Sequence, residues 1–353
     1  MSHIPPPSPL SYNSKEWCEL FLPLSAHNPR KARYRATQVC DWIYKKLITD
    51  YTKMSNLPKN LRDSLQEKIP IELPEVKKVS LSVDGTKKYL LELTDGNLIE
   101  MVLIPAQSKQ TLCVSSQVGC LRKCRFCATG NSGFNRSLNA AEIIAQVLIA
   151  LQDNRETKLT NIVFMGMGEP LDNLDNLCKS IRLLQEEQTL SFSPRRITVS
   201  TCGIIPGMRK LFAERIKVKL AVSLNSAIQE KREYLMPVAK LYPLPTLKEE
   251  LLFYQRNNPF RVTFEYIMIK DFNIGKEDAQ ALIDYIGDLC CKVNLISWNK
   301  TTAKQIFQSP SAQEIERFTE YLQVLPFAVT YRKSRGDDIN AACGQLAARA
   351  KMS

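Results

Sequence analysis

Hydrophobic positions in the first part of the chain recur at helical spacing. One apolar stripe is formed by residues at positions i, i+3, i+4 and i+8, namely Val39, Trp42, Ile43 and Leu47. The pattern predicts a small helical domain over residues 14–75, in which the proline-bearing stretch 70–75 serves as a linker. The Pro- and Ser-rich residues 1–13 are predicted to form a flexible or loosely docked tail.

A different periodicity follows. The apolar runs 89–93 and 98–104 are separated by Asp95-Gly96, a strong hairpin-turn signal, so residues 76–110 are predicted to form a β-hairpin lead-in. Strand and helix patterns alternate after the cysteine-rich loop near residue 120. The predicted strands are 161–165, 196–200, 217–224, 262–269, 292–298 and 327–332, and the predicted helices are 174–185, 208–213, 247–255, 276–289 and 312–322.

This alternation predicts an α/β fold with a parallel sheet and helices outside it. About six strand–helix units are too few to close a TIM-type barrel of eight units. Residues 111–334 are therefore expected to form a partial, open barrel, followed by a C-terminal segment over residues 335–353. The small helical domain precedes this barrel.

Composition and cysteine usage exclude several classes of protein. The chain has 353 residues, of which 44% are hydrophobic, and its apolar stretches are too short to cross a bilayer. Residues 1–9 carry neither the basic nor the apolar part of a secretion signal. Eleven cysteines are an odd number without the spacing of a disulfide framework. We therefore expect a cytoplasmic protein with reduced thiols and no membrane contact.

The net charge of +12 favours a polyanionic partner, most commonly nucleic acid. Many cations are concentrated in the predicted helical domain: Arg30, Lys31, Arg33, Arg35, Lys45, Lys46, Lys53, Lys59, Arg62 and Lys68. Tyr34, Trp42 and Tyr44 lie among them, which suits contact with a nucleic-acid backbone and stacking on bases. A solvated helical face, with charge serving only solubility, explains the same pattern.

Cys120, Cys124 and Cys127 form a C-x3-C-x2-C string. Three thiolates on one loop can hold three irons of a 4Fe-4S cluster and leave the fourth iron open to a small molecule, whereas electron-transfer clusters usually have four protein ligands. A zinc knuckle and three unrelated core cysteines are the alternatives. Zinc sites usually show paired C-x2-C units or a nearby His, and this chain has only His3 and His27, both far upstream. The spacing therefore favours the cluster over zinc.

Further motifs accompany the cysteine triplet along the chain. They are Cys113-Val-Ser-Ser-Gln-Val-Gly-Cys120, Phe126-Cys127-Ala-Thr-Gly, Gly133-Phe-Asn-Arg136, Met165-Gly-Met-Gly-Glu-Pro170 and Arg335-Gly-Asp-Asp-Ile-Asn-Ala-Ala-Cys343-Gly. Together they resemble the radical S-adenosylmethionine (SAM) RNA methyltransferases, which place a methyl group on an adenine ring carbon. The resemblance covers nearly the whole chain, from the basic helical domain to the last few residues.

The resemblance implies a reaction that uses a 4Fe-4S cluster and two SAM molecules per turnover. C2 of adenine is electron-poor and does not attack the methyl sulfonium of SAM, whereas a carbon radical can add to it. One SAM methylates a cysteine, and the other is cleaved reductively to a 5′-deoxyadenosyl radical that takes hydrogen from the S-methyl group. The implied substrates are an adenine of 23S rRNA in the peptidyl-transferase centre and the tRNA adenine just after the anticodon. A flavodoxin- or ferredoxin-type reductant and a monomeric enzyme are expected.

The resemblance also assigns roles to individual residues. Cys343 matches the methyl-carrying cysteine, Cys113 the thiol that forms a transient disulfide with it, and Glu100 the general base. The cysteine triplet matches the cluster ligands. The SAM-contacting positions of the family match Gly168, Glu169, Ser200, Ser223, Leu224, Asn225 and Asn299. Several of these lie at the carboxyl ends of predicted strands, where such barrels place ligands.

The chain departs from the family pattern at two places in the expected SAM pocket. Asn225 stands where the family often has His, and an Asn cannot become cationic. The family usually carries prolines near Asn299, where this chain reads Ser297-Trp-Asn-Lys300.

Three other functions are compatible with parts of the sequence. A sister group methylates C8 of the same rRNA adenine and confers antibiotic resistance, although the string from Cys113 to Cys120 and the large basic domain are more similar to the C2 group. A non-enzymatic zinc-dependent RNA-binding protein would use the basic domain. Another radical SAM activity would leave Cys343 without a role. The other cysteines are expected to pack in the core: Cys18, Cys40, Cys178, Cys202, Cys290 and Cys291.

Overall fold

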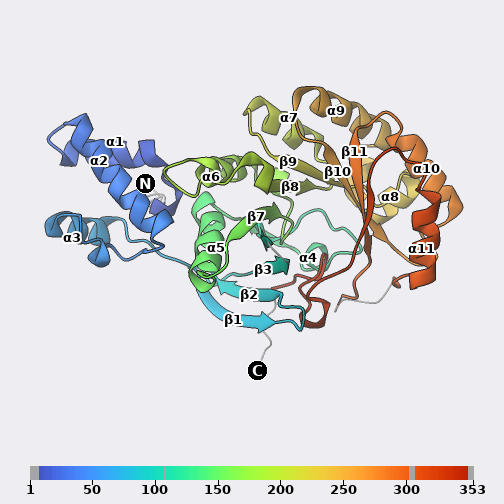
Figure 1. Ribbon diagram of the computed structural model, residues 1–353, viewed down its shortest axis with the longest axis horizontal. Coiled ribbons are helices and arrows are strands. Elements are labelled where there is room, and N and C mark those ends of the chain that lie inside the picture. Colours follow the sequence, from blue (N-terminus) through green and yellow to red (C-terminus); the bar gives the residue numbers. More distant parts are fainter. Residues whose placement is uncertain (1–7, 107–108, 302–306, 349–353) are drawn as a thin grey trace.

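The computed structural model describes residues 8–106, 109–301 and 307–348 (Figure 1). Three helices gather at one end of the molecule, and a curved sheet with helices along its outer side forms the rest (Figure 1). The three helices are α1 (Ser14–Leu24), α2 (Pro29–Cys40) and α3 (Lys59–Lys68). No helix among the described residues is long and apolar enough to span a membrane.

The N-terminal helices begin at strong capping residues. The Asn13 side chain accepts a hydrogen bond from the backbone of Glu16, whose carboxylate in turn binds the backbone of Asn13, and this reciprocal pair starts α1. Asn28 caps α2 through its own side chain, ahead of Pro29 at the first helical position. Trp17 of α1 is fully buried and stacks with a neighbouring ring one helical turn away.

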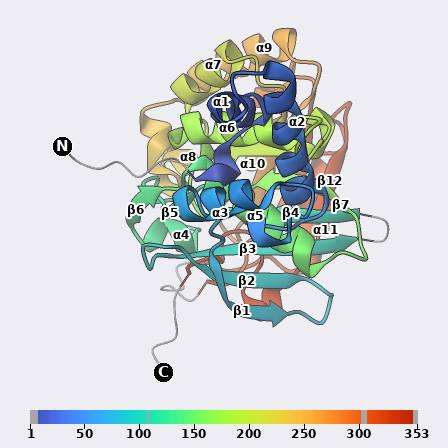
Figure 2. The same ribbon diagram turned by 90° about the vertical axis from the view of Figure 1, so that its left-hand side faces the viewer.

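The prediction of a flexible tail over residues 1–13 is wrong for the second half of that range. Residues 1–7 lie outside the described ranges, but Pro9–Ser11 form a short 3-10 turn in which Leu10 is fully buried. This turn packs against helices of the second part of the molecule, which Figure 2 shows behind the N-terminal helices. The helical domain is also tied down by polar contacts, including a 2.8 Å ion pair between Glu16 and Lys179.

One ten-stranded sheet organises the rest of the chain. Its strands are β1 (Glu75–Leu81), β2 (Lys87–Glu92), β3 (Leu98–Ala106), β4 (Lys109–Cys113), β7 (Leu159–Phe164), β8 (Ile197–Thr201), β9 (Lys219–Ser223), β10 (Val262–Met268), β11 (Cys291–Ser297) and β12 (Val329–Arg332), in that spatial order. β1 to β4 are antiparallel, and β4 to β12 are parallel. In the described part of the chain β4 does not pair with β12, so the barrel is open, as predicted from the sequence.

Helices cover the outer face of the parallel strands (Figure 1). They are α5 (Ala140–Asp153), α6 (Leu174–Gln185), α7 (Ile205–Ala213), α8 (Gln229–Leu235), α9 (Leu244–Asn257), α10 (Lys276–Ile286) and α11 (Ala312–Tyr321), while the short α4 (Ala128–Asn131) directly follows the cysteine-rich loop. Side chains alternate across the sheet, so Phe264 and Tyr266 of β10 pack on the helices while Glu265 lies on the inner face. The inner face is therefore partly polar, which suits a ligand-binding barrel.

Several elements were not anticipated, and two of them have clear reasons. β1 pairs with β2, so the predicted lead-in hairpin is a three-stranded antiparallel extension of the same sheet, and it begins at Glu75, the last residue of the predicted linker. β1 escaped notice because it is exposed along nearly its whole length and shows no apolar alternation. The helix α5 was also missed, since ten of its residues are buried and a helix that is apolar on most sides lacks an amphipathic stripe.

Candidate active site

The three candidate cluster cysteines lie on the loop between β5 (Gln117–Gly119) and α4, just beyond the carboxyl end of β4. Gly119 starts this loop with a φ of +77°. A Cβ atom at this position would lie 2.0 Å from the carbonyl oxygen of Gly133, the residue just before β6 (Phe134–Ser137). Only glycine fits such a turn. The backbone of Cys127 ends the loop by capping α4.

Burial controls the ionisation of these thiols. It raises the pKa of Cys120 to about 12 and that of Cys124 well above its usual value, and the neighbouring thiols add to the effect. Among the described residues, no three His, Cys, Asp or Glu side chains lie closely enough to hold a single metal ion. Three soft sulfur donors on one loop fit an iron–sulfur cluster, which is larger than one ion and stabilises thiolates by its positive charge.

Cys343 is held directly against this loop. The backbone N–H of Ala128 donates to the carbonyl oxygen of Gly344 over 2.7 Å, and Asn299 Nδ2 donates to the carbonyl oxygen of Cys343 over 3.1 Å. The Cys343 side chain is exposed, yet burial is the main cause that raises its pKa. The Cys343 sulfur therefore lies among protein atoms while part of the residue reaches solvent.

Cys113 lies nearby, at the last position of β4. It is buried, and burial raises its pKa well above the usual value of a thiol. The second cause of this shift is the Cys343 side chain, so the two sulfur groups are close enough for their charges to interact. The structure thus brings together two cysteines that are far apart in the sequence, as the resemblance implies.

Glu100 lies on β3 and contacts the same C-terminal segment. Its Oε1 atom forms a 3.0 Å ion pair with Lys88 Nζ, and its Oε2 atom accepts hydrogen bonds from the backbone N–H groups of Ala347 (2.8 Å) and Ala348 (3.1 Å). Leu90 of β2 pairs with Glu100, which places Lys88 diagonally across the two strands on the same face. Sequence reasoning missed Lys88, although the register of the hairpin contained this signal.

The antiparallel extension holds the segment that carries Cys343. In the turn between β1 and β2, Ser82 Oγ donates to Asp338 Oδ1 (2.6 Å), and Asp84 Oδ2 accepts from the backbone of Gly336 (3.0 Å). Arg335 donates to the carbonyl oxygen of Pro105 on β3. In Figure 1 the chain after β12 accordingly returns to the β2–β3 ribbon and α4. The segment that begins at Arg335 therefore docks onto the antiparallel strands and also carries Cys343.

The Met165–Pro170 motif approaches the loop between β4 and β5 closely. Gly168 has a φ of +102°, and a Cβ atom there would lie 2.6 Å from Cβ of Gln117. The Glu169 carboxylate is buried and accepts hydrogen bonds from the backbone of Leu171 (3.1 Å) and Cys202 (2.8 Å). Burial outweighs these bonds and raises the pKa of Glu169. The carboxylate is therefore already held by donors of the protein itself in this structure.

The other residues expected to contact SAM differ in their burial and hydrogen bonding. Ser200 and Ser223 are half-buried near the carboxyl ends of β8 and β9. Arg232 of α8 braces this edge by donating to the carbonyl oxygens of Ser223 (2.7 Å) and Cys202 (2.8 Å). Asn225 is fully buried, and its Oδ1 atom accepts from the backbone of Ile267 over 2.9 Å. Leu224 is fully buried beside it.

The structure therefore separates two groups of expected site residues. Cys113, Glu100, Asn299 and the cysteine triplet all contact or adjoin the segment around Cys343. The side chain of Asn225 instead joins β9 to β10, and its backbone carbonyl oxygen accepts a hydrogen bond from Asn273 Nδ2 over 2.7 Å. No sequence signal pointed to Glu265 and Arg332, whose charges act on the Cys343 thiol from the inner face of the barrel.

The unassigned cysteines are not all core residues. Cys290 is exposed while Cys291 is buried, as expected for neighbours that point in opposite directions. Cys202 is buried, and it lies close enough to Cys124 and Glu169 for their charges to raise its pKa. It belongs to the surroundings of the cysteine loop rather than to a distant core.

The basic N-terminal domain offers fewer stacking surfaces than its sequence suggested. Tyr44 is 3% exposed and cannot stack on a base, and the half-buried ring of Trp42 is covered by Lys46 Nζ at 3.6 Å. Tyr34 is 62% exposed and lines a groove of about 400 Å³ together with Arg30 and Arg33. This groove is the part of the domain suited to nucleic acid.

Comparisons with known proteins agree with this architecture. Residues 27–71 match the N-terminal domain of ribosomal RNA large subunit methyltransferases, and residues 114–286 match the radical SAM superfamily. The crystal structure of a radical SAM methyltransferase from Sphaerobacter thermophilus superposes with a TM-score of 0.92 at 40% sequence identity. The superposition covers 98% of this chain and 100% of that one. Membership of the radical SAM superfamily implies SAM and a 4Fe-4S cluster as cofactors.

Two curated relatives are similar over most of their length. The dual-specificity RNA methyltransferase RlmN of Lawsonia intracellularis is 45% identical over 323 residues, which cover 89% of this chain and 90% of the relative. The protein of the same name from Nitratiruptor sp. is 41% identical over 329 residues, which cover 89% and 92%. With 41% to 45% identity to these relatives over 89% of its length and the fold of a radical SAM methyltransferase, the chain belongs to the RlmN family of radical SAM RNA methyltransferases.

Proposed function

We propose that this protein methylates C2 of adenine in two RNAs, 23S rRNA at the peptidyl-transferase centre and tRNA at the position just after the anticodon. The observation that carries the proposal is that Cys343, on a segment bound to the cysteine loop, lies close enough to Cys113 for their charges to interact. A methyltransferase that passes its methyl group directly from SAM to RNA needs no such pair of thiols. A carrier cysteine and a resolving cysteine explain the pair.

Each cofactor has candidate ligands in this chain. Cys120, Cys124 and Cys127 would hold the cluster, and SAM would contact Gly168, Glu169, Ser200, Ser223, Leu224, Asn225 and Asn299. When bound, the cluster and SAM supply the one-electron chemistry that produces a 5′-deoxyadenosyl radical, while a second SAM supplies the methyl group. Polar side chains such as Glu265 lie on the inner face of the barrel that would hold these groups.

The chain's own residues account for the remaining steps. Cys343 loses a proton to accept the methyl group, and the methylene carbon derived from it becomes bonded to C2. Glu100 takes the proton that C2 loses, and the unpaired electron left on the adduct would return to the cluster held by Cys120, Cys124 and Cys127. Cys113 then attacks the Cys343 sulfur, an S–S bond forms as the S–C bond breaks, and the released carbon takes a proton to become the methyl group. A flavodoxin- or ferredoxin-type donor in the cytoplasm returns the disulfide to two thiols and supplies electrons to the cluster, and we infer that the enzyme acts as a monomer.

Mass spectrometry of RNA nucleosides tests this function. RNA from cells that lack the gene should contain no 2-methyladenosine in 23S rRNA or in tRNA, and the gene should restore it in both. Loss of 8-methyladenosine would assign the protein to the C8 group instead. Unchanged nucleosides, or a purified protein with one zinc and neither iron nor sulfide, would contradict the proposal.

A further inference from the structure

Arg232 is a charged side chain in the interior of the molecule. It lies on α8, is 1% exposed, and donates hydrogen bonds to the backbone carbonyl oxygens of Ser223, Leu224 and Cys202. Its Nε atom is buried and has no hydrogen-bond acceptor among the described residues. Burial lowers the pKa of the guanidinium, but an arginine keeps its proton in proteins. A full positive charge is therefore held inside the protein.

Within the described part of the chain, no carboxylate neutralises Arg232. Its guanidinium forms no ion pair within 4.0 Å there. Burying a charge is costly unless a group of opposite charge lies nearby. Backbone carbonyl groups accept the hydrogen bonds of the guanidinium, but they carry no net charge. The protein groups around Arg232 thus supply acceptors without supplying a counter-charge.

The helix that carries Arg232 is docked on the cysteine loop. The backbone N–H of Arg125, the residue after Cys124, donates to the carbonyl oxygen of Leu235 at the end of α8 over 2.9 Å. The Arg125 guanidinium also lies over the ring of Tyr234, 4.2 Å from its centre. Arg232 precedes Leu235 by about one helical turn. The buried charge therefore lies on the short helix that contacts the loop.

Arg232 is close enough to the candidate cluster ligands to act on them. Burial raises the pKa of Cys124 well above its usual value, and the charge of Arg232 acts in the opposite direction. Cys202 connects the two groups, because its carbonyl oxygen accepts from Arg232 Nη2 over 2.8 Å and its thiol is near enough to Cys124 for their charges to interact. The partly buried Arg122 of the loop is instead paired with Asp172.

An iron–sulfur cluster held by three thiolates would provide the counter-charge. The thiolates outweigh the positive charge of the iron–sulfur core, so the cluster as a whole is an anion, and reduction adds one further negative charge. Net charge, hydrogen bonds and solvent exposure set the reduction potential of such clusters. A buried cation is screened little by water or salt, so its attraction favours the reduced, more negative form.

We propose that Arg232 is the counter-charge of the cluster bound by Cys120, Cys124 and Cys127, and that it raises the reduction potential of this cluster. One electron passes from the flavodoxin- or ferredoxin-type donor to the cluster, so the donor is oxidised, and Arg232 makes this transfer more favourable. Arg232 acts through the cluster and is therefore a positioning residue. The proposal rests on the iron–sulfur cluster of the proposed function, but not on which RNA is methylated.

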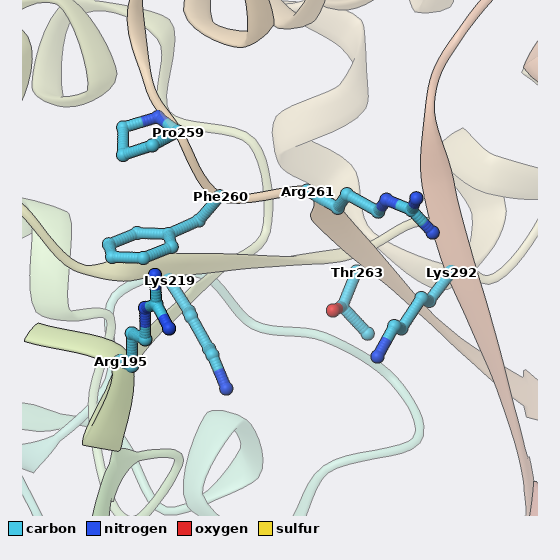
Figure 3. A pocket seen from close by; sticks show the side chains of 7 residues that line it. All are labelled: Arg195, Lys219, Pro259, Phe260, Arg261, Thr263 and Lys292. Carbon is cyan, nitrogen blue, oxygen red and sulfur yellow. The ribbon is translucent and has the colours of Figure 1, made fainter.

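Arg261 provides a matched control at the other end of the barrel. It is exposed, immediately precedes β10, and lines a cavity of about 630 Å³ among other basic side chains (Figure 3). Four residues further along, Glu265 pairs with Ser223, whose carbonyl oxygen Arg232 binds. Four strand residues span about 13 Å, which exceeds the screening length of about 10 Å at 0.1 M salt. Replacing Arg261 thus removes the same charge from a distant, solvated position.

The test is a redox titration of the holoenzyme without SAM or RNA, in which electron paramagnetic resonance follows the reduced cluster. Arg232→Gln should lower the midpoint potential by about 59 mV or more, which is a change of at least about tenfold in the equilibrium constant for one electron. Arg232→Lys keeps the charge but loses the planar set of donors, so this equilibrium constant should stay within about threefold of the wild type. Arg261→Gln should match the wild type.

The variants separate the charge of Arg232 from its hydrogen bonds. Equal potentials for Arg232→Gln and the wild type would overturn the proposal, and so would an equal decrease in Arg232→Lys or in Arg261→Gln. Loss of iron and sulfide from both Arg232 variants would also overturn it, because these two share the lost hydrogen bonds and not the lost charge. Loss from Arg232→Gln alone, with a wild-type potential in Arg232→Lys, would support it. A wild-type protein without iron and sulfide would instead contradict the proposed function.

Discussion

The carboxylate of Glu100 has two tasks in this structure. It is the candidate base, and it also anchors the C-terminal segment through the backbone of Ala347 and Ala348 while Lys88 balances its charge. Its Oε1 atom carries only the ion pair with Lys88, so a lone pair remains there for a proton from substrate while Oε2 holds the segment. The docked segment and the role of Glu100 as a base are thus compatible in this structure.

Replacing Glu100 with Gln should separate these tasks. The amide keeps an acceptor for the backbone N–H groups but cannot remove the C2 proton, so RNA methylation should fall by about a hundredfold or more. Methylation of Cys343 itself should persist, as seen in the mass of its peptide. Glu250→Gln, which alters an ion pair with Arg209 on the outer helices, is the matched control and should leave both reactions unchanged. Equal methylation of RNA by the two variants would exclude Glu100 as the base.

Replacing Cys113 with Ala should trap the RNA on the protein. Without the second thiol the bond between Cys343 and the base is not resolved, so a covalent protein–RNA species should accumulate and be visible on a denaturing gel. Cys178→Ala, at another buried cysteine on α6, should form no such species. Free methylated product from the Cys113 variant at the wild-type rate would contradict the role of Cys113.

At the scale of elements, the antiparallel extension serves the barrel by holding its last segment. The turn between β1 and β2 presents Ser82 and Asp84 to Asp338 and Gly336, and β3 contributes Glu100. Of these strands β1 is largely exposed and adds little to the core, whereas β2 and β3 bury several apolar side chains. Their contribution is to position Cys343 against the cysteine loop.

The hydrogen bonds of Asp84 predict that the stability of the folded protein depends on pH. Burial opposes its ionisation, but hydrogen bonds from Thr86 and Gly336 outweigh burial and lower the pKa of Asp84 from 3.8 to about 2. A depressed carboxyl pKa stabilises the folded state above pH 4, and this contribution disappears as the pH falls from about 4 to about 2. The free energy of unfolding of the wild type should exceed that of Asp84→Asn at pH 6, measured with urea on cluster-free protein. The difference should shrink steadily below pH 4, and a difference independent of pH would contradict this origin.

At the scale of the whole molecule, one basic surface lies on the N-terminal domain. It is the groove around Arg30, Arg33 and Tyr34, at the end of the molecule formed by the three N-terminal helices (Figures 1 and 2). An RNA that contacts this groove while an adenine lies at Cys343 would be fixed in orientation as well as in place.

The groove predicts a salt-dependent contribution to RNA affinity. Arg30→Gln with Arg33→Gln should weaken binding of an RNA hairpin that contains the target adenine, and the loss should shrink as the salt concentration rises, because fewer phosphates are neutralised. Titrations with fluorescent RNA at several salt concentrations would measure this. Unchanged affinity at every salt concentration would mean that the groove does not bind the RNA.

The sequence was informative where local patterns decide structure. The periodicities located most helices and parallel strands, and the helix expected at 174–185 is α6 with the same bounds. The open barrel also followed from the number of strand–helix units. Local patterns could not reveal β1, because an exposed edge strand has no apolar alternation, nor the buried helix α5.

The site was predictable in its residues but not in its connections. The motifs pointed to Cys343, Cys113 and Glu100, whereas the contact of Asp338 with the β1–β2 turn joins residues 256 positions apart. The use of the Asn225 side chain between two strands was likewise invisible, since it depends on the register of β9 and β10. These contacts can be found only from the tertiary structure.

The contacts that join the C-terminal segment to the antiparallel strands connect residues far apart in the sequence, and this separation affects how the protein folds. Glu100 meets Ala347 across 247 residues, so these bonds form late and carry a high cost in chain entropy. During synthesis the cysteine loop and Cys113 leave the ribosome, and the barrel can begin to assemble, long before Cys343 exists. The two reactive thiols therefore cannot oxidise to each other on the nascent chain, and they meet only after the cysteine loop that they serve has been made.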